Sequence, residues 1–300
     1  MKALIYICLI LLLIMPAEQI YGAERARMTH VMSIYDDGNG LGILNPEDVE
    51  CSSNDDFIVA DTGRDRLLKF KLTGKKAEPA GEIKLKELRY PTSVKTNSKG
   101  EIFALDGRSR KILIISPEGE FQGYLTPDKL RAPSKFITKS IHVDWRDNIY
   151  ILDIYGQRIL VLDKDAHLIS QIRFPKDIGF ISELTVDFKG GIFLVDSVKN
   201  RVYAADRASG AMFPLTTALD KYLRFPTNIS SDERGRLYIV DRNGSLILVM
   251  AQDGSILGEL SGMGWKDGLL NYPAGLCINE KHMFIADTLN NRIQIFRLIK

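Results

Sequence analysis

The 300-residue sequence is 45% apolar and 26% charged, which is ordinary globular composition without a disordered or low-complexity tract. Its 40 Lys+Arg and 38 Asp+Glu leave a formal net charge of +2, so it has no global basic field of the kind that binds nucleic acid. A chain of this length can form a single all-β repeat domain.

The N-terminus has the pattern of an export signal. Lys2 is followed by thirteen apolar residues, Ala3–Met15, and then by Pro16. A membrane-spanning helix needs about 20 apolar residues, whereas the apolar part of a signal peptide needs roughly 7–15. We therefore expect residues 1–22 to be a signal peptide cleaved after Gly22 or Ala23, with a short uncleaved anchor as the alternative. The expected location is periplasmic or extracellular, with no membrane span after signal removal.

One feature recurs six times after the N-terminus: a β-branched or aromatic run that ends in aspartate. The six aspartates are Asp61, Asp106, Asp153, Asp196, Asp241 and Asp287, at spacings of 45, 47, 43, 45 and 46 residues. A polar turn and a second apolar run follow each aspartate, which predicts a β-hairpin.

The remainder of each repeat predicts two further strands. A proline precedes the aspartate by about fifteen residues in four of the repeats, namely Pro46, Pro91, Pro226 and Pro273. A short strand and a tight turn lie between the proline and the aspartate run, and a fourth strand follows the hairpin. Four strands in roughly 43–47 residues is the pattern of a propeller blade. The runs are apolar throughout, as expected of strands buried between neighbouring sheets.

The two ends of the chain indicate how the ring closes. Only three strands fit between Pro273 and Lys300, and residues 29–36 belong to no other blade. We expect this N-terminal strand to complete the last blade, which removes an exposed sheet edge. The sequence thus predicts an all-β fold, a six-bladed β-propeller of four-stranded blades over residues 28–300. The predicted blade ranges are 46–90, 91–132, 133–178, 179–225, 226–270, and 271–300 with 28–45.

Two cysteines remain after signal removal, Cys51 and Cys277. Cys51 lies five residues after Pro46 and Cys277 lies four residues after Pro273, so their positions within the repeat differ by one residue. Because successive side chains of a strand point to opposite faces, we interpret the two as buried free thiols rather than as a disulfide.

The hairpins resemble the NHL repeat, in which an aspartate and a short turn precede an arginine and an apolar strand. The clearest matches are Asp287–Ile293, Asp61–Leu67 and Asp196–Val202, whereas the second and fifth repeats depart from the pattern. The resemblance covers the whole mature chain. Because the Asp–Arg feature recurs in most blades, we expect it to stabilise the turn rather than to perform chemistry.

The resemblance implies two kinds of function. NHL propellers often act as protein- or ligand-binding platforms, and some bind RNA, a role that export and the low net charge argue against. Other six-bladed propellers are metal-dependent enzymes, among them gluconolactonase-like hydrolases and the peptide-amidating lyase, which uses histidines on zinc. The four histidines, His30, His142, His167 and His282, fall at unrelated repeat positions, so a three-histidine zinc site is not expected.

Oxygen ligands offer a second possibility for a metal site. Two residues after the repeat proline, the repeats carry Asp48, Ser93, Asn228 and Gly275; in the third and fourth repeats, which lack the proline, the spacing from the aspartate places Ser140 and Glu183 at the same position. Gluconolactonase-like propellers hold a divalent cation with Glu, Asn and Asp, and Asp48, Glu183 and Asn228 are the matching types here. Such hard ligands suit calcium. The alternative is a solvated polar channel mouth that holds no metal.

The longest Gly-rich connector, 262–272, carries Trp265, Lys266, Asp267 and Tyr272. Exposed aromatic residues beside charges are typical of partner contacts, although Trp265 packed on the channel rim is the alternative. From these patterns we expect a non-catalytic scaffold that binds a protein, peptide or glycan, without nucleic acid as a partner. The alternative is a metal-dependent hydrolase or lyase with its site at the channel mouth.

Overall fold

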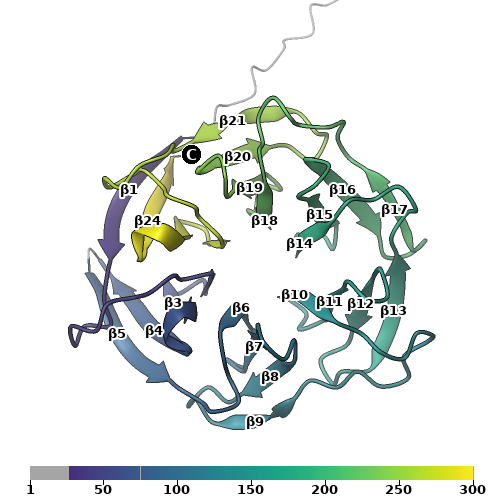
Figure 1. Cartoon of the computed structure of the whole chain (residues 1–300), viewed down its shortest axis with the longest axis horizontal. Coiled ribbons are helices and arrows are strands. Elements are labelled where there is room, and N and C mark those ends of the chain that lie inside the picture. Colours follow the sequence, from purple (N-terminus) through teal and green to yellow (C-terminus); the bar gives the residue numbers. More distant parts are fainter. Residues whose placement is uncertain (1–26, 75, 300) are drawn as a thin grey trace, which may run out of the picture.

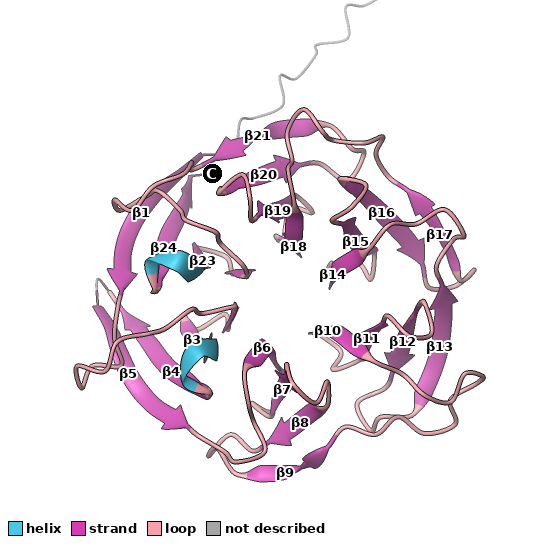
Figure 2. Ribbon diagram, in the orientation of Figure 1, coloured by secondary structure: helices cyan, strands magenta, loops and turns pink. Residues whose placement is uncertain are grey.

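The computed structural model describes residues 27–74 and 76–299. These residues form six four-stranded antiparallel sheets arranged as blades around a central channel (Figure 1). Apart from the strands, two short 3₁₀ helices occur, η1 (Thr62–Arg64) and η2 (Thr288–Asn290), drawn in cyan in Figure 2. The predicted six-bladed propeller is confirmed. The predicted signal peptide, residues 1–22, lies outside the described residues.

Blades one to five run outward from the channel in chain order, and in blade six the N-terminal strand β1 is the outermost strand. The strands of blades one to three are β2 Asp48–Cys51, β3 Asp56–Asp61, β4 Arg66–Thr73 and β5 Lys76–Ile83; β6 Pro91–Thr96, β7 Ile102–Asp106, β8 Ile112–Ile115 and β9 Phe121–Tyr124; β10 Thr138–Val143, β11 Ile149–Asp153, β12 Arg158–Leu162 and β13 Leu168–Arg173. Those of blades four to six are β14 Ile181–Val186, β15 Ile192–Asp196, β16 Arg201–Asp206 and β17 Ala211–Pro214; β18 Pro226–Ser231, β19 Leu237–Asp241, β20 Leu246–Met250 and β21 Ile256–Leu260; β22 Leu276–Ile278, β23 His282–Asp287, β24 Arg292–Ile299 and β1 Arg27–Ile34. Among the described residues, none of the helices has the length and the hydropathy that a bilayer span requires.

The N-terminal strand closes the ring as predicted. β1 pairs antiparallel with β24, from Arg27 opposite Ile299 to Ile34 opposite Ile293. The pairing covers the free edge of β24, which would otherwise be open to another chain.

The hydrophobic core consists of six clusters, and each cluster combines side chains from two neighbouring blades. Between β11 and β15, for example, Leu152 and Leu194 contribute to the same cluster. Both faces of a blade are thus covered by its neighbours. This packing explains why the sequence runs are apolar throughout instead of alternating.

The six repeat aspartates fix the chain where it enters each inner strand. In every blade, the carboxylate accepts a hydrogen bond from a backbone N–H sixteen or seventeen residues earlier, as Asp196 does from Gly179 and Phe180. In three blades, a buried arginine five residues later donates its Nε–H to the same carboxylate: Arg66, Arg158 and Arg292, at 2.6–2.8 Å. The structural interpretation of the Asp–Arg feature is confirmed, and its consequence is a fixed start for each channel-lining strand.

The prediction of free thiols at Cys51 and Cys277 is wrong, because the two residues form a disulfide with a Cα–Cα distance of 5.8 Å. Cys51 ends β2 of blade one, and Cys277 lies in β22 of blade six. Neighbouring blades pack face to face, so the two sides that meet are opposite faces of equivalent sheets. A one-residue offset therefore points the two side chains toward each other.

Candidate functional site

The innermost strands bring one ring of polar residues together in the channel. Each of blades one to five contributes one residue to this ring, and that residue pairs across the sheet with the residue just before the repeat aspartate. In blade six, the Gly275 carbonyl accepts a hydrogen bond from the N–H of Ala286, which is the residue just before Asp287. The ring consists of Asp48, Ser93, Ser140, Glu183, Asn228 and Gly275, all of them buried. The register thus places Ser140 and Glu183 where the spacing from the aspartate predicts them.

A β-bulge precedes the ring residue in blades two to five, where the register skips one residue. The skipped residues are Thr92, Lys139, Ser182 and Thr227, and all four line one mouth of the channel. We call this end, where the chain enters the inner strands, the loop mouth. Bulges commonly redirect side chains beside functional sites, and here one of them directs Lys139 into the pocket.

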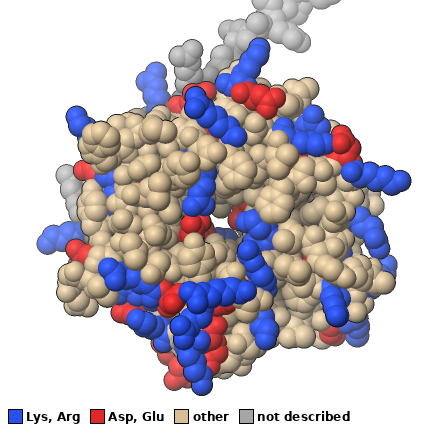
Figure 3. All heavy atoms as spheres, viewed as in Figure 1, with Lys and Arg blue, Asp and Glu red and all other residues tan. Residues whose placement is uncertain are grey.

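The loop mouth is a pocket of about 210 Å³. Phe180 and Phe225 contribute apolar walls, and Glu183 and Asn228 also line it. Arg242 crosses to blade one and donates two hydrogen bonds to the Glu47 carboxylate, at 2.9 and 3.0 Å. Figure 3 shows acidic and basic atoms around the central opening within a mostly uncharged face. A concave site with apolar walls and a few convergent polar groups is the usual form of a small-molecule site.

Glu183 is the most strongly perturbed acid of this mouth. Burial raises its pKa to about 7, although Lys95, Lys139 and the Ser140 hydroxyl act in the opposite direction. The carboxylate accepts hydrogen bonds from the Ser140 hydroxyl, from the Leu184 N–H at 2.9 Å and from the Asn228 amide at 3.5 Å. A carboxyl group with a pKa near neutrality can both accept and return a proton.

Asp48 lies in the same ring, but its oxygens are already engaged. Oδ1 accepts a hydrogen bond from the Val49 N–H at 2.9 Å, and Oδ2 accepts from the Val94 N–H at 3.0 Å. The ammonium group of Lys95 lies 2.8 Å from the same Oδ2. Glu183 and Asn228 contact each other, whereas Asp48 contacts a fixed cation. As arranged, these three residues do not fit a divalent cation.

A second ring lies two residues further along the inner strands and includes Glu50, Lys95 and His142. These side chains share a pocket of about 180 Å³ with Glu183 and Asn228. Burial raises the pKa of Glu50 to about 7. Burial, assisted by the Lys95 charge, lowers the pKa of His142 to about 4. His142 is therefore neutral near pH 7, and Lys95 is the cation of this layer.

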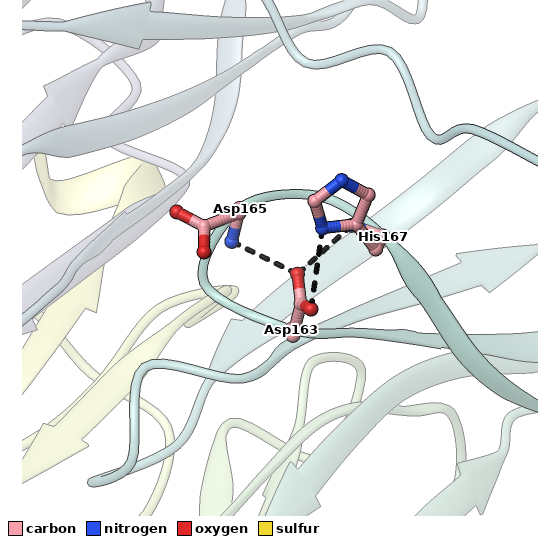
Figure 4. Close-up of side chains that lie close together, drawn as sticks. All are labelled: Asp163, Asp165 and His167. Atoms are coloured by element: carbon pink, nitrogen blue, oxygen red, sulfur yellow. Dashed lines mark hydrogen bonds and ion pairs between the residues drawn. The ribbon is translucent and has the colours of Figure 1, made fainter.

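The four histidines lie apart, as expected, in β1, β10, the turn before β13, and β23. Within residues 27–74 and 76–299, one group offers three possible metal ligands close together, Asp163, Asp165 and His167 (Figure 4). It lies on an exposed turn, where Asp163 Oδ1 accepts hydrogen bonds from the N–H groups of Asp165 and His167. This is ordinary Asx-turn chemistry, which forms without a metal.

The connector 262–272 presents its tryptophan to solvent, since Trp265 is 79% exposed. The alternative in which Trp265 packs on the channel rim is therefore wrong. Asp267 lies 3.1 Å from Arg292 and accepts a hydrogen bond from Ser33, so this carboxylate connects the loop to blade six. Lys266 and Tyr272 are exposed.

Sequence reasoning missed Lys95, Glu50, Lys139 and Arg242. The signal for Lys95 and Glu50 was present, because a step of two along a strand returns to the same face as the Asp48 ring. The bulge that aims Lys139, and the contact of Arg242 with Glu47 across blade six, have no comparable local signal.

No family model matches the chain, and no curated protein matches it in sequence. Solved structures do match. A virginiamycin B lyase from Staphylococcus aureus is 16% identical, with 91% of this chain and all of that chain covered and a TM-score of 0.64. A gluconolactonase from Xanthomonas campestris is 13% identical, with 92% of each chain covered and a TM-score of 0.67. A luciferin-regenerating enzyme is 13% identical, with 92% and 95% covered and a TM-score of 0.64. At these identities the likeness establishes the β-propeller fold, and membership of the NHL family stays a prediction.

Proposed function

We propose that the chain is a hydrolase or lyase that acts on a small ester, such as a lactone, at the loop mouth. The observation that carries this proposal is Glu183, a buried carboxyl with a pKa of about 7 that lines a pocket with aromatic walls. Strongly shifted acids in concave pockets are typical of acid–base catalysis.

The similar structures favour this reading over the scaffold. A virginiamycin B lyase, a gluconolactonase and a luciferin-regenerating enzyme all share the propeller, and each is an enzyme by name. From these similar structures we infer only that this fold can support chemistry on small molecules. The roles of residues in this chain rest on its own loop mouth.

Glu183 is suited to act as the general base. In hydrolysis, its carboxylate takes a proton from water, the hydroxide adds to the ester carbonyl carbon, and the ester C–O bond breaks. Protonated Glu183 then returns the proton to the departing oxygen. In elimination, the same carboxylate takes a proton from the carbon next to the one that bears the ester oxygen; a C=C bond forms, the C–O bond breaks, and the substrate's carboxylate leaves with its electron pair. Positioned acid–base groups of this kind contribute roughly 10²–10⁴-fold to rate.

Two cations in the same pocket suit the negative charge that develops on the carbonyl oxygen. Arg242 is held by both oxygens of Glu47, so its guanidinium group is already oriented. Burial lowers the pKa of Lys139, and within the described residues its ammonium group forms no ion pair. In its protonated form, Lys139 is available to a substrate oxygen in the pocket.

The test is hydrolysis of a panel of lactones and esters by the purified protein, followed in a pH-stat. For any substrate that is turned over, Glu183→Gln should lower kcat at least 100-fold. The wild-type kcat/KM should rise through an apparent pKa near 7, because the base must be deprotonated.

Glu233→Gln is the matched control, because Glu233 is an exposed acid that lines the opposite channel mouth. That variant should keep the wild-type rate. A wild-type rate in Glu183→Gln, or a loss in Glu233→Gln alone, would contradict the assignment of the loop mouth.

Two untested expectations remain as proposals. We infer export, because disulfides such as Cys51–Cys277 persist mainly in oxidising compartments; recovery of the chain solely from the cytosol on fractionation would contradict this.

The second candidate function is a scaffold for a protein, peptide or glycan, which the exposure of Trp265 (79%) and Met263 (65%) supports.

A further inference from the structure

The side chain of Lys95 lies inside the channel, surrounded by oxygen atoms. Its Nζ is 2.8 Å from Asp48 Oδ2, 2.9 Å from the Val94 carbonyl oxygen and 3.5 Å from Glu50 Oε2. The side chain of Lys95 is only 13% exposed and that of Asp48 only 4%. Two carboxylates and one backbone carbonyl are the ligand types that calcium takes in proteins.

The titratable groups that face Lys95 come from three other blades. Asp48 and Glu50 lie on β2 of blade one, His142 on β10 of blade three, and Glu183 on β14 of blade four. Burial opposes the charge of Lys95, but Asp48, Glu50 and Glu183 together raise its pKa above the usual value. The ammonium group is therefore charged at neutral pH, whereas His142 is not.

We propose that the channel contains a latent divalent-cation site that Lys95 fills with its own ammonium group. Asp48, Glu50 and the Val94 carbonyl form the pocket for this internal cation. Asn228 Oδ1, which has no hydrogen-bond partner among the described residues, lines a pocket together with Glu50 and Lys95 and offers a further oxygen donor there. With Lys95 in place, the native chain should not bind a divalent cation there.

The physical reason is competition for the same oxygens. A divalent cation beside Asp48 would lie against a tethered ammonium group, and like charges at this separation repel strongly away from bulk water. Lys95 cannot leave readily, since its release would leave the buried Asp48 carboxylate and the partly buried Glu50 carboxylate without a counter-charge. The substitution Lys95→Met removes the competitor while keeping an unbranched side chain of similar length.

The test is calcium titration calorimetry on EDTA-treated full-length protein. Wild type should show no calcium binding in the channel. Lys95→Met should bind one calcium ion per chain, with an affinity at least tenfold above the weakest that the titration can detect. Adding Asp48→Asn to Lys95→Met should abolish the gain. Lys139→Met is the matched control, because it removes another channel lysine that lies away from these oxygens, and it should gain nothing.

Two results would overturn the proposal: one calcium bound by wild type and lost in Asp48→Asn, or no calcium bound by a folded Lys95→Met. Lys95→Gln, which keeps a polar side chain, serves as the second variant should Lys95→Met not fold. The comparison of wild type with Asp48→Asn can overturn the proposal independently of either Lys95 variant. Because calcium binding is measured without substrate, the outcome does not depend on whether Glu183 catalyses a reaction.

Discussion

The Cys51–Cys277 disulfide joins the first and last blades across a sequence separation of 226 residues. The loss of chain entropy on closing a loop of that length corresponds to about 5 kcal/mol at 25 °C, and native disulfides typically contribute about 2–4 kcal/mol. The pairing of β1 with β24 also closes the ring and remains when the bond is removed. We therefore expect Cys51→Ala/Cys277→Ala to lower the free energy of unfolding by about 2–4 kcal/mol.

The assay is guanidinium unfolding of the oxidised wild type, the reduced wild type and the double variant. The reduced protein and the double variant should share one lowered midpoint, because both lack the same constraint on the unfolded chain. Mass spectrometry after thiol alkylation should find no free thiol at either cysteine of the native protein. Labelled thiols, or a midpoint unchanged by reduction, would refute the reasoning from opposed blade faces.

Two further predictions concern the blades and the exposed connector. Arg292→Leu should cost about 3–5 kcal/mol of unfolding free energy, because it leaves the Asp287 carboxylate buried without its charged partner. Arg201→Leu at the equivalent position should cost about 1 kcal/mol or less, since Arg201 Nε has no partner among the described residues; equal losses in thermal melts would contradict the pairing argument. Under the scaffold function, Trp265→Ala should weaken binding to an immobilised panel of peptides and glycans while changing stability by about 0.5 kcal/mol or less. Unchanged binding would remove that connector as the contact site.

The fold could be predicted because each repeat carries its own local signals. An apolar run ending in aspartate, a polar turn and a second run define a hairpin without reference to any distant residue. Counting strands at the two ends of the chain was enough to predict ring closure by β1. The polar ring from Asp48 to Asn228 followed from the same repeat register.

The candidate site was predicted only in part, because its chemistry depends on neighbours that are distant in sequence. Glu183 was selected as a channel residue, but its raised pKa results from burial between blades that no local pattern reports. Whether Asp48 is available to a metal depends on Lys95, 47 residues away. The disulfide was missed because a one-residue offset was treated as if both strands belonged to one sheet.

The sequence by itself determined the number of blades, the four-strand repeat, the closing strand and the residues that form the polar ring, because strand formation and register depend on neighbours within one repeat. The tertiary structure alone decided the disulfide, the pairing of Lys95 with Asp48, the position of Lys139 at a bulge, and the exposure of Trp265. These features depend on how opposite faces of separate blades meet, and on burial and charge summed over several strands around one channel.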